Sequence, residues 1–303
     1  MAKLKEVDTN TAQQPRIEDW KSADASNEAK LPATTDAAGQ VPAPVTTSSI
    51  DDMLAEDSAM GKENITLTSM AIPRLSVLQP LSPQCLEGKS EYMPEAKPGM
   101  IYDSVAHKIY SGAKGIRCIP VNYRFAHLEW IPRNAGGGFV ADHGADATIL
   151  AKCTPNDKKM MMTPEGHEII GTHEYYVYVY NDEDNTVFQA VISMAKTQSG
   201  KARGWNTSIN QLEIEHPKGS GKMINPAMFY RSYVLTTKPE QNDQGMWFGW
   251  IITPAEMVPM LPRGSELYLK ARQFYKDIAA GKVEVAKPVE MGGNQEESED
   301  LPM

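Results

Sequence analysis

Alternating apolar and polar side chains predict that the folded part of the chain is mostly β-sheet. Residues 115–125 alternate in this way, and residues 173–180 (His-Glu-Tyr-Tyr-Val-Tyr-Val-Tyr) are dense in aromatic and β-branched side chains, which favour strands. Three further strands are predicted at residues 186–194, 229–238 and 246–253. The polar segment 239–245 contains Pro, Asn, Asp and Gly. It predicts a turn that joins the last two strands into a hairpin.

Two segments carry a helical pattern instead. From Ser265 onward, apolar side chains recur at spacings of 4, 3 and 4 residues, and Gly281 can end the helix. These apolar side chains are Leu267, Ala271, Phe274 and Ile278. A shorter helix is predicted around residues 50–60, with Ser49 as its N-cap.

Five or more antiparallel strands followed by a helix favour a β-rich α+β fold. We expect a partly closed antiparallel barrel, like the oligonucleotide-binding fold, with inserted loops and a C-terminal helix. This domain should span residues 61–285. Residues 1–60 are acidic and poor in large apolar side chains, so they should form a disordered N-terminal region. Residues 286–303 should form a disordered, acidic C-terminal interaction tail.

The charge is distributed unevenly along the chain. The net charge is −9, which by itself argues against nucleic-acid binding. However, residues 1–60 hold 5 basic and 11 acidic side chains, and residues 283–303 hold 1 and 6. The intervening body therefore holds 24 basic and 22 acidic side chains. A nearly neutral body between acidic ends is compatible with a DNA-binding domain and equally with an ordinary protein that has solvated ends.

Three stretches of the body carry basic side chains with no acidic residue among them, and these are the predicted phosphate contacts. The first stretch holds Lys108, Lys114, Arg117 and Arg124; the second holds Lys196, Lys201 and Arg203; the third holds Lys218, Lys222, Arg231 and Lys238. We select all of these except Lys238 as candidate DNA-binding residues.

Aromatic side chains accompany the basic ones. Residues 196–206 are predicted to form a basic loop of small residues that ends near Trp205. A cationic groove with aromatic rings that stack on bases is the general means of binding single strands, so Trp205 joins the candidate DNA-binding residues. Alternatively, Trp205 packs on the core. The same two alternatives apply to Tyr123 and Phe125, whereas the stripe formed by Tyr176, Tyr178 and Tyr180 is expected to pack beneath a helix or loop.

Motifs for catalysis are missing, so we expect a protein that is not an enzyme and uses no cofactor or metal. The segment 219–223 (Gly-Ser-Gly-Lys-Met) lacks both the first Gly and the final Ser or Thr of a phosphate-binding loop. The spacing of His167 and His173 does not fit a metal-ligand pair, and the sequence has no nucleophile elbow. The 3 widely spaced cysteines indicate a reducing compartment. Since no apolar leader or membrane span is evident, we expect a cytoplasmic protein.

The last residues combine acidic side chains with an apolar tip: Glu299, Asp300, Leu301, Pro302 and Met303. This ending resembles the C-terminal tip of bacterial and phage single-stranded DNA-binding proteins, although Met303 stands where the bacterial family usually has Phe. The resemblance implies that these five residues recruit replication or recombination proteins. The alternative is an ordinary solubilising tail.

A wider pattern resembles a group of phage-encoded proteins usually found with replication genes. It comprises residues 72–83 (Ile-Pro-Arg-Leu-Ser-Val-Leu-Gln-Pro-Leu-Ser-Pro), Ile119-Pro-Val, Glu129-Trp130, Trp205-Asn206 and the Asn242-Asp-x-Gly turn. The resemblance implies sequence-independent binding of single-stranded DNA in phage replication or recombination. The alternative is a phage structural or accessory protein with no nucleic-acid activity.

Overall fold

The computed structural model describes residues 50–288, apart from residues 59, 67, 68, 183, 184, 244 and 284. It divides the chain into two units, residues 1–60 and 61–303. The described part of the first unit contains helix α1 (Ile50–Glu56), which confirms the short helix predicted there. The disorder predicted for residues before 50, and that predicted for the tail beyond residue 288, concern residues outside the described part.

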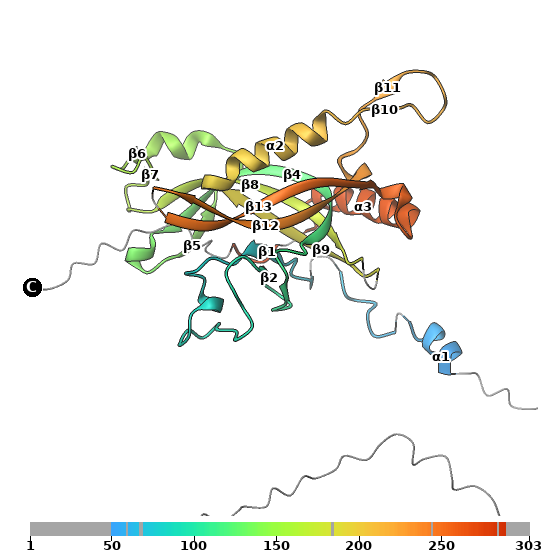
Figure 1. The fold of residues 1–303 in the computed structure, drawn as a ribbon, viewed down its shortest axis with the longest axis horizontal. Helices are drawn as coiled ribbons and strands as arrows, with labels where there is room; N and C mark the ends of the chain where they lie inside the picture. The colour runs from blue at the N-terminus through green and yellow to red at the C-terminus, as the bar shows by residue number, and fades with distance from the viewer. Residues whose placement is uncertain are drawn as a thin grey trace, which may run out of the picture. The chain divides into compact units, whose positions relative to one another are not determined.

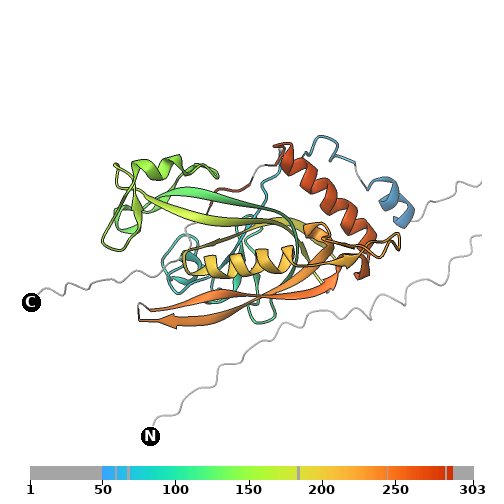
Figure 2. The same ribbon diagram turned by 90° about the horizontal axis from the view of Figure 1, so that it is seen from above.

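The second unit is built on one large, strongly curled sheet (Figures 1 and 2), which has 11 strands within the described residues. Its main path runs in the order β13 (Gly245–Met257), β12 (Arg231–Asn242), β4 (Ile116–Ile131), β8 (Glu168–Tyr180), β9 (Val187–Ala195), β1 (Arg74–Val77), β2 (Ile101–Asp103) and β3 (Ile109–Tyr110). Three strands lie off this path: β5 (Gly138–Asp142) pairs with β4, and β7 (Met161–Met162) pairs with both β8 and β6 (Thr154–Pro155). The sheet is a half-barrel, so the β-rich prediction is confirmed.

Two α-helices lie in the described part of this unit, α2 (Ser199–Asn210) and α3 (Gly264–Ala279), and they cover opposite faces of the sheet. Consecutive residues of a strand point to opposite faces. In β8, Tyr175 stacks on Trp205 of α2, whereas Tyr176 contacts Phe274 of α3. After α2 the chain forms a small separate hairpin of β10 (Ile214–Glu215) and β11 (Met223–Ile224). The C-terminal helix and its buried residues Leu267, Ala271 and Phe274 match the sequence prediction.

The predicted strands exist, although their bounds differ from those expected. The hairpin strands β12 and β13 continue to a tight turn at Asp243, with Pro239 inside β12 opposite Phe248. Phe248 directs its backbone N–H and C=O away from β12, since both bond to Gln79. Its partner Pro239 therefore also points its nitrogen away from β13, and the missing N–H removes no bond from the hairpin.

Residues 196–206 were predicted to form a loop, and this prediction is wrong from Ser199 onward, because residues 199–210 form helix α2. The segment did not look helical in the sequence because it contains Gly200 and Gly204. Each glycine lowers helix stability by about 1 kcal/mol relative to Ala. The buried side chains of Ala202 and Trp205 lie three residues apart and both face the sheet. Their burial offsets the low intrinsic propensity, so tertiary packing decides the conformation here.

The sheet also departs from a purely antiparallel barrel. β1 pairs with β9 in parallel, while the other pairs along the main path are antiparallel. Central strand β4 contains Pro120, and its register with β8 shifts between Pro120 and Asn122. A bulge at this point accommodates the residue that has no N–H for the ladder.

The segment between β1 and β4 reaches across to the β12–β13 hairpin and brings the sheet towards closure. Thr237 of β12 donates from its backbone to Gly112 O at 2.9 Å and from its hydroxyl to Gly99 O at 2.5 Å. Gly112 is required at this crossing, because a Cβ there would lie 1.8 Å from Gly99 O. Within the described residues, no helix is long and apolar enough to cross a membrane.

Candidate functional site

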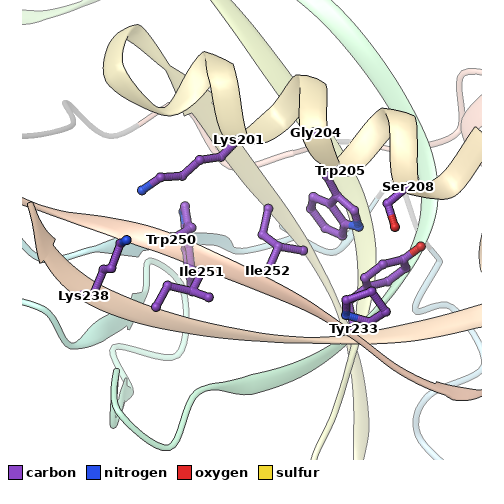
Figure 3. Close-up of a pocket in the computed structure, with 10 residues that line it drawn as sticks. Lys201, Gly204, Trp205, Ser208, Tyr233, Lys238, Trp250, Ile251 and Ile252 are labelled. Carbon is purple, nitrogen blue, oxygen red and sulfur yellow. The ribbon is translucent and has the colours of Figure 1, made fainter.

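A pocket of about 280 Å³ lies between helix α2 and the β12–β13 hairpin (Figure 3). We call it the α2–hairpin pocket. Its aromatic lining consists of Trp205 from α2, Tyr233 from β12 and Trp250 from β13. Figure 3 shows Lys201 and Lys238 towards one end of the pocket and Ser208 and Tyr233 towards the other. One end is therefore cationic, and the other carries hydroxyl groups.

Trp205 is fixed tightly in the wall of this pocket. Its side chain is 2 % exposed, and its ring stacks on Tyr175 with centroids 4.2 Å apart. Tyr233 contacts it edge-on at 5.5 Å. The Tyr175 hydroxyl bonds to Ala202 O and to Asn206 Oδ1, both at 2.8 Å, and thereby holds α2 in place. The indole Nε1 of Trp205 is buried and has no hydrogen-bond partner among the described residues.

Two lysines share one carboxylate at the cationic end. Lys201 Nζ lies 2.6 Å from Glu240 Oε1, and Lys238 Nζ lies 3.8 Å from the same atom. Burial by itself would raise the pKa of Glu240, but Lys201, a hydrogen bond from Trp247 Nε1 and the charge of Lys238 hold that pKa below its usual value. Glu240 is therefore ionised at neutral pH, and the group keeps one net positive charge.

Gly249 makes room for this charged group. A Cβ at residue 249 would lie 2.2 Å from Lys201 Nζ and 2.6 Å from Glu240 Oε2. The absence of a side chain lets both charged groups rest on the strand backbone. Sequence analysis did not select Lys238, Glu240 or Gly249. Strand periodicity in the sequence does place Lys238 and Glu240 on one face of β12. It could not predict that this face lies close to α2.

Four of the predicted DNA-binding residues already form ion pairs within the protein. These pairs are Arg117 with Asp182 and Glu256, Arg124 with Asp142 and Glu174, Lys196 with Glu168, and Lys201 with Glu240. Each acidic partner lies well outside the acid-free stretch that holds its basic residue, so sequence inspection missed the pairing. Phosphate would have to compete with these carboxylates for the four side chains.

Other predicted basic residues are exposed and have no acidic partner among the described side chains. They are Arg203 on α2, Lys218 and Lys222 in the β10–β11 turn, and Lys108 between β2 and β3. Lys114 is also exposed, and Arg231 is half-buried with its Nε atom unpartnered within the described part. The Asn225 side chain bonds to Asn210 O at 2.7 Å and to Leu212 O at 2.9 Å, which ties the β10–β11 hairpin to the end of α2. Arg203, Lys218 and Lys222 therefore follow one another along α2 and the hairpin beyond it.

The aromatic residues proposed as stacking platforms are mostly part of the core. Trp205 is buried, as the alternative interpretation expected. Tyr123 is half-buried, and its hydroxyl lies 2.9 Å from His173 Nδ1. Tyr178 packs against Phe274 of α3 at 5.3 Å, which agrees with a stripe covered by a helix. The partner-binding residues predicted at the tip, Glu299 to Met303, lie beyond the described part of the chain.

One further cluster surrounds Glu129 on β4. Its two carboxylate oxygens lie 2.7 Å from His143 Nε2 and 2.6 Å from His167 Nδ1. These distances are those of hydrogen bonds to a carboxylate. No group of three or more His, Cys, Asp or Glu side chains in the described part of the chain is arranged to hold a metal ion.

Comparison with known families identifies the chain's relatives. The profile of the family described as Pam3 phage gp34-like protein matches residues 43–284. The chain therefore belongs to this phage protein family. Neither the curated proteins nor the solved structures that were searched contain a match.

Proposed function

We propose that this member of a phage protein family binds single-stranded DNA without sequence preference and serves phage replication or recombination. The observation that carries the proposal is the convergence at the α2–hairpin pocket. Lys201 and Lys238 come from two different acid-free stretches, and they lie together at one end of a pocket that is also lined by Trp205, Tyr233 and Trp250. Cations beside aromatic rings are the combination that single strands require.

The exposed cations beyond the pocket extend this surface. Arg203, Lys218 and Lys222 are exposed and carry no ion pair with any described side chain. A basic side chain that binds phosphate releases a counterion from DNA. Arg203, Lys218 and Lys222 can do so without losing an internal ion pair, so they are better phosphate contacts than Arg117 or Arg124. The proposed path therefore runs from the pocket along α2 to the β10–β11 turn.

The acidic C-terminal tip has a separate role in this proposal. Glu299 and Asp300 would aid the encounter with a basic partner surface, and residues 301–303 would supply an apolar anchor. The partners would be replication or recombination proteins. In this proposal the chain acts by binding and recruitment, with no catalytic step of its own.

A second candidate is a phage structural or accessory protein with no nucleic-acid activity. One observation favours it: Arg117, Arg124, Lys196 and Lys201 form internal ion pairs, and most of the aromatic residues pack in the core. In that case the charged and aromatic residues stabilise the fold and do nothing else.

Fluorescence anisotropy of a labelled oligo-dT with the full-length chain tests the proposal, with duplex DNA of equal length as competitor. We expect binding that is selective for single strands and weakens as salt rises. A variant with Arg203, Lys218 and Lys222 all changed to Gln should lower the salt slope by about 2, since each phosphate contact contributes roughly 0.7.

The matched control changes three exposed lysines that were not predicted to bind DNA, Lys62, Lys89 and Lys97, to Gln. It alters the net charge equally but lies outside α2 and the β10–β11 hairpin, and its salt slope should equal that of the wild type. No binding of the wild type even at low salt would overturn the proposal and favour the structural or accessory role.

A further inference from the structure

The α2–hairpin pocket contains an unused hydrogen-bond donor. Trp205 Nε1 is buried and has no partner in the described part of the chain. Figure 3 shows this nitrogen directed towards Ser208 and Tyr233, at the hydroxyl end of the pocket. A buried donor without an acceptor is unfavourable, and such groups in native structures call for an explanation. A ligand atom that accepts a hydrogen bond here would satisfy the donor.

The dimensions and lining of the pocket restrict what this ligand can be. About 280 Å³ is slightly below the roughly 300–1,000 Å³ typical of pockets for drug-sized molecules. Ile252 and Trp250 form an apolar wall on the hairpin side, and the Gly204 backbone leaves the α2 side open. The space suits a single ring that carries an acceptor on its edge.

The cationic end of the pocket places a second requirement on the ligand, which is a negative charge. Lys201 and Lys238 lie at the opposite end from Ser208, and together with Glu240 they keep one net positive charge. A ligand that fits both ends has a hydrogen-bond acceptor on a ring and an anion attached to that ring through a short linkage. A nucleotide within a strand has this arrangement, because its base carries carbonyl oxygens or ring nitrogens and its sugar carries phosphate.

We propose that the α2–hairpin pocket receives one base of the bound strand, which accepts a hydrogen bond from Trp205 Nε1 while a flanking phosphate contacts Lys238. This inference rests on the proposed function, and it assigns a base-binding subsite to the proposed DNA-binding surface. The base packs against Ile252 and the Gly204 backbone. Trp205 itself contributes its edge, since one face of its ring is covered by Tyr175.

Gly204 offers a direct test. A Cβ at residue 204 would meet no atom within 4 Å, so Gly204→Leu places a side chain in the pocket without a backbone clash. Gly204→Ala is the matched control, because it adds helix propensity but fills little space. The measurement is the affinity of the full-length chain for an oligo-dT and for an abasic oligonucleotide of the same length and charge.

We expect the wild type and Gly204→Ala to bind oligo-dT about tenfold more tightly than the abasic strand, given the typical energy of one base contact. Gly204→Leu should bind both strands equally, at the affinity that the wild type shows for the abasic strand. If the wild type binds both strands equally, the base subsite is wrong while backbone binding stands. If Gly204→Leu keeps the preference, bases bind elsewhere. If the wild type binds neither strand, the proposed function fails as well.

Trp205→Phe provides a second test of the donor. It removes the N–H but keeps an aromatic ring in the core, and circular dichroism establishes that it folds. We expect the difference in binding free energy between oligo-dT and the abasic strand to fall to half of the wild-type value or less. The affinity for the abasic strand should stay unchanged. A full preference for oligo-dT in the folded variant would overturn the assignment of Nε1.

Discussion

Gln79 takes the place of a neighbouring strand for Phe248 at the free edge of β13. Its Nε2 donates to Phe248 O at 2.9 Å, and its Oε1 accepts from the Phe248 N–H at 2.8 Å. Two residues further along the same edge, the Trp250 N–H donates to Gln198 Oε1 at 3.1 Å. The side-chain amides of Gln79 and Gln198 thus bond to backbone groups of β13 that would otherwise be unpaired at the sheet edge. Gln79 also links β13 to the segment that follows β1.

We predict that Gln79→Ala destabilises the protein by about 1–3 kcal/mol, because Phe248 loses both hydrogen-bond partners. Urea unfolding followed by circular dichroism gives the free energy of unfolding. Gln273→Ala is the control, since Gln273 bonds to Asp277 on the exposed surface of α3 and should change the stability by less than about 0.5 kcal/mol. Equal effects of the two substitutions would contradict the role assigned to Gln79.

Alanine substitutions at Gly112 and Gly249 should have different consequences. At Gly112 the new Cβ would lie 1.8 Å from the backbone oxygen of Gly99, so the backbone must move. At Gly249 the nearest atoms are the ends of flexible side chains, which can shift. We expect a loss of about 3 kcal/mol for Gly112→Ala and about 1 kcal/mol for Gly249→Ala. Thermal and chemical unfolding of both variants would check this order, and the reverse order would refute it.

Glu174 should be the most sensitive charged residue of the sheet. It is fully buried and lies 2.5 Å from Arg74 Nη1 and 2.6 Å from Arg124 Nε. Glu174→Gln leaves these guanidinium groups without their shared carboxylate, so the free energy of unfolding should fall by about 3–5 kcal/mol. Glu256→Gln, which removes an exposed partner of Arg117, should lower it by at most about 1 kcal/mol. A small loss for Glu174→Gln would show that the buried charges are compensated in another way.

The stability difference between the wild type and Glu240→Gln should depend on pH. The folded-state pKa of Glu240 lies below its ordinary value of 4.5, so the unfolded chain binds the proton more readily than the folded one. The stabilisation by Glu240 is therefore complete above about pH 4.5 and declines as the pH falls through the lowered pKa. Unfolding free energies measured for both proteins from neutral to acidic pH should converge, whereas a constant difference would be inconsistent with an ionised Glu240 beside Lys201.

Deletion of residues 301–303 should separate recruitment from DNA binding. We expect the truncated chain to bind oligo-dT with the affinity of the full-length chain and to lose its replication or recombination partner. Affinity capture from phage-infected host extract, followed by identification of the retained proteins, compares the two chains. Gln295→Ala is the control within the same tail. If the truncation releases no partner, the recruitment role is wrong.

Local patterns in the sequence were sufficient for the elements whose side chains repeat regularly. The 4-3-4 spacing of Leu267, Ala271, Phe274 and Ile278 predicted α3, because helical geometry alone places such residues on one face. Alternation likewise predicted β4, the density of aromatic and β-branched side chains predicted β8, and the polar turn at residues 239–245 predicted the β12–β13 hairpin. The β-rich class followed from these elements without any knowledge of strand order.

Only the tertiary structure decided which distant residues meet. Helix α2 forms despite Gly200 and Gly204 because Ala202 and Trp205 are buried against the sheet. The pairing of Arg124 with Glu174, and the meeting of Lys201 with Glu240, join residues that are dozens of positions apart. Interactions at such separations depend on how the sheet curls and on where α2 packs. Short-range periodicity in the sequence predicts neither of these. The composition therefore predicted basic and aromatic candidates, while the fold determined which of them are paired, buried or exposed.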